Sequence, residues 1–90
     1  MSQKDNSIAI GHYSGFKTQG TSAVAIGDNA GNMNQNDKAI AIGYEAGKTD
    51  QSFNSIAIGP YSGFETQGTS AVAIGNNAGN VNQNDKAIAI

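Results

Sequence analysis

The chain has 90 residues, 12 of them glycine, with no cysteine, no tryptophan and a formal net charge of −2. The lack of cysteine excludes a disulfide framework, a thiolate metal site and a cysteine nucleophile. Five basic side chains against seven acidic ones give no positive field for nucleic acid or anionic lipid. The longest apolar runs have four residues, as in 39–42, which is too short to insert in a membrane, and residues 1–6 lack the apolar core of a signal peptide.

A sixteen-residue repeat runs through the chain. The tetrapeptide [Ile/Val]-Ala-Ile-Gly begins at five equally spaced positions, and Ile88-Ala89-Ile90 begins a sixth copy. We expect one repeat domain over residues 1–90, with coils at 7–22, 23–38, 39–54, 55–70 and 71–86 and partial coils at 1–6 and 87–90.

Each repeat opens with a predicted strand, because alternation places its two large side chains on one face and its small ones on the other. A helix is excluded, since two glycines per sixteen residues would break it. We expect the large aliphatic columns to form the core inside the coil: Ile8, Ile10, Val24, Ile26, Ile40, Ile42, Ile56, Ile58, Val72, Ile74, Ile88 and Ile90. The opposite face, of alanine and serine, is expected to be buried against another subunit.

Two glycine columns follow the strand and predict turns or close backbone approaches. The first comprises Gly11, Gly27, Gly43, Gly59 and Gly75, and the second comprises Gly15, Gly31, Gly47, Gly63 and Gly79. A second, weaker extended segment then ends near a glutamine, and a loop returns the chain to the next strand.

All the glutamines of the chain form a single column: Gln3, Gln19, Gln35, Gln51, Gln67 and Gln83. In a stack of coils these side chains can bond to one another as an amide ladder. The alternative is a solvated loop residue that duplication has preserved.

Coils of constant length predict an all-β parallel solenoid, in which each strand pairs with its copies above and below. A second period of 48 residues lies over the first, because residues 7–42 and 55–90 differ at only four positions. Three types of coil therefore alternate: one with serine, tyrosine and phenylalanine, one rich in asparagine, and one that contains Tyr44 and Glu45. A single coil encloses little core, so we expect the chain to associate.

The segments 6–14 and 54–62, which read Asn-Ser-Ile-Ala-Ile-Gly-x-Tyr-Ser, resemble the YadA-like head repeats of trimeric autotransporter adhesins. The resemblance implies a left-handed parallel β-roll, a homotrimer, surface adhesion and a place on a cell surface. Similar repeats in giant-virus and phage proteins extend the expectation to a virion surface. The sixteen-residue step is a little longer than the family's usual one, which would enlarge the outer loop.

From these features we expect a non-enzymatic structural protein, the head of an adhesin or of a viral or phage spike. The alternative is a filament subunit that polymerises head to tail through open solenoid ends. The expected partners are other copies of the chain and an extracellular-matrix protein or glycan. The candidate ligand surface comprises His12, Tyr13, Phe16, Lys17, Tyr61 and Phe64; its aromatic residues could instead pack over a loop or a trimer seam.

No catalytic residue, cofactor or metal site is expected. Residues 43–49 imitate a phosphate-binding loop but have three residues between the glycines where that motif needs four. His12 is the only histidine, and no second ligand of its kind accompanies it. The aspartates lie among asparagines without the spacing of a calcium loop.

Overall fold

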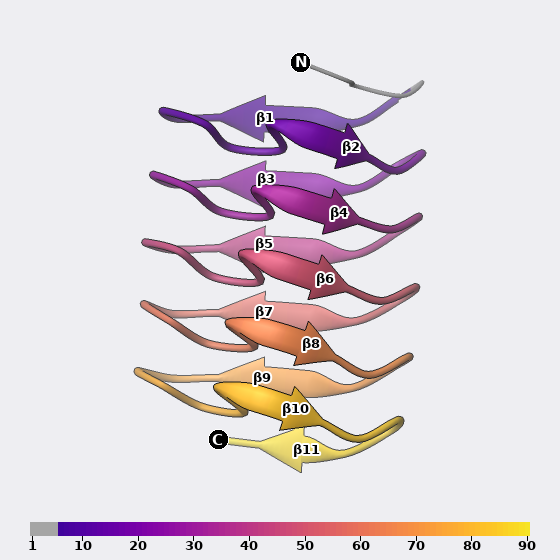
Figure 1. The fold of residues 1–90 in the computed structure, drawn as a ribbon, viewed down its shortest axis with the longest axis vertical. Helices are drawn as coiled ribbons and strands as arrows, with labels where there is room; N and C mark the ends of the chain where they lie inside the picture. The colour runs from indigo at the N-terminus through magenta and orange to yellow at the C-terminus, as the bar shows by residue number, and fades with distance from the viewer. Residues whose placement is uncertain (1–5) are drawn as a thin grey trace.

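The computed structural model describes residues 6–90, which form an all-β parallel solenoid of about five coils at a spacing of sixteen residues (Figure 1). None of these residues belongs to a helix of the length and apolarity needed to cross a membrane. One sheet has six strands: β1 (Ile8–Ile10), β3 (Val24–Ile26), β5 (Ile40–Ile42), β7 (Ile56–Ile58), β9 (Val72–Ile74) and β11 (Ile88–Ala89). The opposite sheet has five: β2 (Lys17–Gln19), β4 (Met33–Gln35), β6 (Thr49–Gln51), β8 (Glu65–Gln67) and β10 (Val81–Gln83).

Successive coils stack in a register of sixteen residues. Ile8 lies opposite Val24, and Lys17 lies opposite Met33. The backbone follows the same step outside the strands, as where the amide of Gly27 donates to the carbonyl of Ile10 at 2.8 Å. In Figure 1 the odd-numbered strands lie at the back and run to the left, and the even-numbered strands lie at the front and run to the right. Because the chain descends as it winds in this direction, the solenoid is left-handed.

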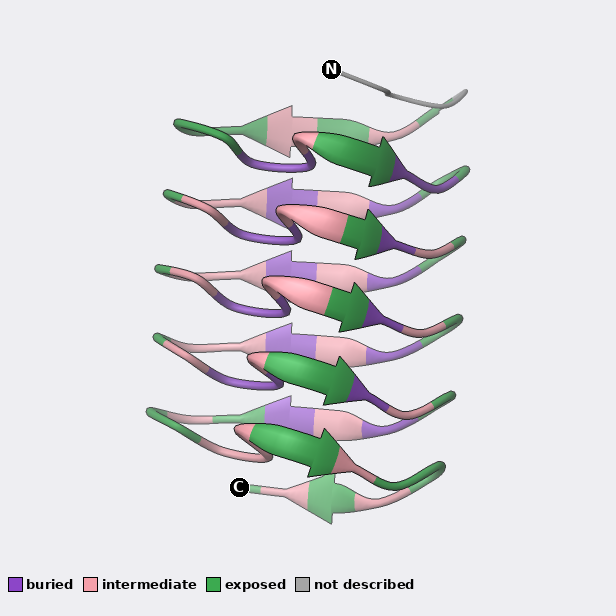
Figure 2. Cartoon of the chain, viewed as in Figure 1, coloured by how far each residue is buried: buried purple, intermediate pink, exposed green. Residues whose placement is uncertain are grey.

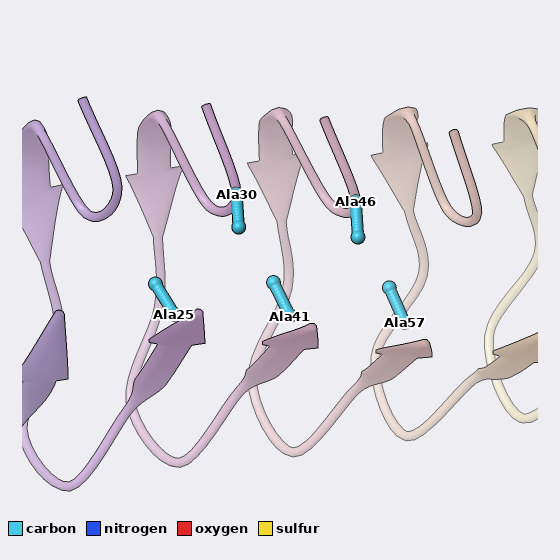
Figure 3. Packing of buried hydrophobic residues seen from close by; sticks show 5 residues of the cluster. All are labelled: Ala25, Ala30, Ala41, Ala46 and Ala57. Carbon is cyan, nitrogen blue, oxygen red and sulfur yellow. The ribbon is translucent and has the colours of Figure 1, made fainter. Parts of the chain in front are cut away.

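The interior of the coil is made of small residues. The central alanines of the strands are fully buried from β3 to β9, and so are the residues one position before the strands, such as Ala39 and Ser55 (Figure 2). Figure 3 shows the central column with Ala25, Ala41 and Ala57, and beside it a second buried column from the turns that follow the strands, with Ala30 and Ala46.

The large aliphatic columns lie on the outside, so their prediction as the core is wrong. In the middle of the stack Ile40 and Ile42 are half-buried, whereas Ala41 between them is fully buried. In the first described coil Ile8 is 46% exposed and Ile10 is 58% exposed. The same twelve residues must be reassigned to the outer face of the six-stranded sheet: Ile8, Ile10, Val24, Ile26, Ile40, Ile42, Ile56, Ile58, Val72, Ile74, Ile88 and Ile90. The prediction that the alanine and serine face meets another subunit is wrong for the same reason, because that face is the interior.

The physical reason is the narrow space between the two sheets. A glutamine side chain crosses it in each coil, and the Nε2 of Gln19 donates to the carbonyl of Ile8 in the opposite sheet at 2.6 Å. A Cβ atom added at Gly15 would lie only 2.7 Å from the Cδ of Gln19. An interior this full has room for alanine but none for two isoleucines per coil.

The first glycine column is required by the contact between coils. Gly27 has φ +128°, and a Cβ atom there would lie 2.7 Å from the carbonyl oxygen of Gly43 in the next coil. A side chain at this corner would therefore meet both an unfavourable backbone conformation and a steric clash.

Candidate binding surfaces

The outer side of the six-stranded sheet carries the large aliphatic side chains of the strands. We call it the aliphatic face; it comprises Ile8, Ile10, Val24, Ile26, Ile40, Ile42, Ile56, Ile58, Val72, Ile74, Ile88 and Ile90. These side chains are half-buried in the middle of the stack by their neighbours above and below, and more exposed toward its ends. Partly exposed aliphatic side chains gathered on one outer face are typical of a protein–protein interface.

The glutamine column forms a ladder inside the coil. Each described Nε2 donates to the Oε1 of the glutamine in the next coil, at 3.2 Å from Gln19 to Gln35, 3.0 Å from Gln35 to Gln51, 3.2 Å from Gln51 to Gln67 and 3.1 Å from Gln67 to Gln83. Gln3, the first residue of the predicted column, lies outside the described residues. The ladder is buried at Gln19, Gln35, Gln51 and Gln67, so it contributes to the scaffold and not to a ligand surface.

Aromatic side chains gather where the chain turns from one sheet to the other. We call this side the turn edge; it comprises residues 12–16, 28–32, 44–48, 60–64 and 76–80. A first cluster joins His12, Tyr13 and Phe16, with ring centroids 3.9 Å apart for the first pair and 4.8 Å for the second. A second cluster joins Tyr44, Tyr61 and Phe64, with centroid distances of 5.4 and 5.7 Å.

The structure therefore brings together five of the six candidate ligand residues in two groups. Lys17, the sixth, is exposed on β2, on the outer side of the five-stranded sheet. Tyr44, Glu45 and Lys48, which also line the second cluster, are not among the candidate ligand residues predicted from the sequence. The sixteen-residue step could have identified Glu45 and Lys48, because Glu45 lies one step before Tyr61 and Lys48 lies one step before Phe64. It could not have identified Tyr44, because one step after Tyr44 is Pro60.

Few charges lie on the turn edge, and most of them face a partner of opposite sign. The Nδ1 of His12 lies 3.6 Å from Asp28, and the Nζ of Lys48 lies 3.9 Å from Glu45. Lys48 also lies over the ring of Phe64, 5.5 Å from its centroid. A hydrogen bond with Glu45 and the negative charge of that residue raise the pKa of Tyr44 above its usual value.

The tyrosines of the turn edge occupy strained backbone positions. Tyr13 and Tyr61 have φ of 58° and 61°, in the left-handed region that asparagine tolerates better than most residues. The asparagine-rich coils have Asn29 and Asn77 in the same column. The coil that follows each tyrosine supports it, since the Nδ2 of Asn80 donates to the carbonyl of Tyr61 at 3.0 Å.

The described residues present surfaces and no enclosed site. Residues 6–90 contain no pocket, and they bring no three metal-ligating side chains together. The arrangement presents side chains at regular intervals along the stack.

Comparison with known families gives one match. The model of the YadA head domain repeat matches two segments, residues 17–30 and residues 66–78, and confirms the resemblance seen in the sequence. Each segment begins on the five-stranded sheet and ends in the turn after the next strand of the six-stranded sheet. No curated protein and no solved structure matches the chain.

Proposed function

The chain contains YadA-like head repeats, and from this premise we propose that it is the rigid, homotrimeric head of a surface adhesin or of a viral or phage spike. The family consists of structural adhesin domains, is not known for enzymes, and typically forms homotrimers; it suggests a cell-surface or extracellular location. In this proposal the solenoid carries no chemistry of its own. It holds loop residues at a regular spacing on a stiff support.

The observation that carries the proposal is the aliphatic face. The interior of the coil is already filled by alanine and glutamine, so the isoleucines cannot turn inward. Burying a large aliphatic side chain contributes about 1.5–3 kcal/mol, and the aliphatic face presents two such residues per coil. Association through this face therefore supplies the apolar burial that a single coil lacks.

A closed ring is the arrangement that uses this face fully. Three copies arranged around an axis would cover one another's isoleucines. Because the ring is closed, assembly would stop at a particle of fixed size. The turn edge and the outer side of the five-stranded sheet would remain free to contact a ligand. Stiffness along the rod would come from the parallel backbone bonds and the glutamine ladder.

The oligomeric state tests the proposal. We expect sedimentation equilibrium to give a trimer for the unmodified chain and for Thr69→Lys, which adds a charge at an exposed loop position. Ile42→Lys should dissociate the trimer, because it places a charge at the middle of the aliphatic face. A monomer mass for the unmodified chain, with full β circular dichroism, would overturn the proposal.

Ile42→Lys could also unfold the chain, so a second measurement uses the unmodified protein. Binding between copies stabilises the folded state by mass action, and the melting temperature of a trimer therefore rises with protein concentration. A melting temperature independent of concentration would contradict association. The filament alternative stays a prediction, and sedimentation separates it because head-to-tail growth gives species larger than a trimer.

A further inference from the structure

We propose that the cluster of Tyr44, Tyr61 and Phe64, flanked by Glu45 and Lys48, is a binding site for a neutral polysaccharide. The inference rests on the proposed function, because it names the ligand that the displayed turn edge would contact. It concerns a site that spans two adjacent coils, 39–54 and 55–70.

The rings meet edge to face, so each contact covers at most one face of a ring, and Lys48 lies over the ring of Phe64. Tyr44 and Tyr61 meet edge to face at 89°, and Tyr61 and Phe64 meet at 69°. Tyr44 is 45% exposed. The face of an aromatic ring carries partial negative charge and attracts weakly polarised C–H groups. The axial C–H groups of a pyranose ring are ligands of this kind.

Polar groups for sugar hydroxyls lie beside the rings. The ammonium of Lys48, whose side chain is 32% exposed, can donate a hydrogen bond, whereas the carboxylate of Glu45 is 15% exposed and orients Lys48 and Tyr44. The two charges lie 3.9 Å apart and offset each other. Lys48 is the only basic residue of the turn edge in these two coils, so the site lacks the cationic cluster that a sulfated or acidic glycan would need.

The backbone conformation at Glu45 and Tyr61 does not favour the residues found there, so the fold alone does not explain them. Glu45 and Tyr61 have φ of 55° and 61°, where asparagine costs less, and Asn29 and Asn77 occupy the same column in other coils. The fold therefore accepts asparagine here. A strained position that carries a large, partly exposed ring is a reasonable signal of function.

The shape of the surface favours an extended ligand over a small molecule. The described residues form no pocket, so affinity has to come from several shallow contacts. The first cluster, with Tyr13 and Phe16, lies on the same edge three coils away, about 14 Å at the usual spacing between strands. Two clusters per chain would bind one long polysaccharide with avidity.

A matrix protein is the less favoured partner. A stable protein–protein interface buries about 800 Å² on each side. The second cluster spans two coils, which is about 10 Å along the stack. An area this small suits one or two sugar rings.

The experiment is native electrophoresis of the full chain in gels that contain one polysaccharide each: hydroxyethyl cellulose, xylan or dextran as neutral chains, and heparin as the anionic one. Tyr61→Asn and Phe64→Asn are the test variants, because Asn77 and Asn80 occupy these columns in the next coil. The control is Phe53→Thr, which removes a 50% exposed ring outside the turn edge and introduces the residue found at 69.

We expect at least one neutral polysaccharide to retard the chain and the Phe53→Thr control equally. Each test variant should bind about five-fold more weakly, as expected for the loss of one aromatic contact. Three results would overturn the proposal: no retardation by any neutral polysaccharide, retardation by heparin alone, or an equal loss in Phe53→Thr. Capture of collagen on a plate that Tyr61→Asn abolishes, without polysaccharide binding, would assign the cluster to a protein partner instead.

The oligomeric state of the same samples separates the two proposals. A trimer that no neutral polysaccharide retards refutes the site and leaves the trimeric head in place. A monomer that is retarded, and that loses retardation in Tyr61→Asn, supports the site and refutes the trimeric head.

Discussion

Gln35 donates from its Nε2 to the Oε1 of Gln51 at 3.0 Å and, from the same nitrogen, to the carbonyl oxygen of Val24 at 2.7 Å. The first bond joins two successive coils, and the second joins the two sheets of one coil. A single buried side chain therefore connects the molecule both along the stack and across it. This double role explains why an amide is placed where a small solenoid would otherwise have an apolar core.

Replacing Gln51 by methionine should remove both connections with little change in volume. The substitution leaves the carbonyl of Ile40 and the Oε1 of Gln67 without their buried donor, which costs about 1–3 kcal/mol for each group. We expect the free energy of unfolding, measured by urea at fixed protein concentration, to fall by about 3 kcal/mol. Thr69→Ser, at an exposed loop position, is the control, and equal stabilities of the two variants would contradict the role of the ladder.

Alanine substitutions at two glycines of one column should separate backbone strain from steric clash. Gly27 and Gly75 have similar φ of 128° and 124°, but an added Cβ would lie 2.7 Å from the carbonyl of Gly43 in the first case and 3.9 Å from the nearest atoms in the second. We expect Gly75→Ala to lower the free energy of unfolding by about 1–2 kcal/mol and Gly27→Ala by at least about 1 kcal/mol more. Thermal melts of the two variants side by side provide the measurement. A smaller loss at Gly27 would show that the stacked corners can move apart.

The Lys38→Asn substitution should stabilise the chain. Lys38 has φ of 62°, and the same column contains Asn54 with φ of 59°. Because asparagine adopts this conformation at lower cost, we expect a gain of about 0.5–1 kcal/mol in the free energy of unfolding. Lys38→Val, with a β-branched side chain, should lower it. Denaturation curves should give the highest free energy of unfolding for Lys38→Asn, a lower one for the unmodified chain and the lowest for Lys38→Val. Any other order would contradict backbone strain at this position.

The phenol of Tyr44 should ionise at a higher pH in the unmodified chain than in Glu45→Gln. Hydrogen bonding with Glu45 is the largest cause of the raised pKa, and the negative charge of Glu45 is the next. A raised pKa in the folded state means that the interaction stabilises the fold at neutral pH and is lost as the pH rises through that value. Absorbance titration in a background of Tyr13→Phe and Tyr61→Phe isolates Tyr44. The expected result is a lower midpoint in Glu45→Gln, and an unchanged midpoint would show that the two side chains do not interact in solution.

The columns of the solenoid could be predicted from spacing alone, and the second aromatic cluster shows how far this information reaches. A step of sixteen residues places Lys48 beside Phe64 and Glu45 beside Tyr61. The contact between Tyr44 and Tyr61 does not follow from that step, because these residues belong to neighbouring columns. Only the path of the turn brings their rings within 5.4 Å. The repeat spacing predicts which residues stack within one column, whereas contacts between columns depend on the three-dimensional path of each coil.

The sequence by itself determined that the chain winds with a constant step, that its strands are parallel, and that glutamine follows glutamine from coil to coil, because an exact repeat allows only one register. It did not determine which face of the strand is the interior. Alternation is symmetric, and Ile40 and Ala41 satisfy it equally well in either orientation. The tertiary structure decided this point through volume: the two sheets lie so close together that the space between them accepts alanine and a glutamine side chain, and the isoleucines are left outside as the surface through which the chain can associate.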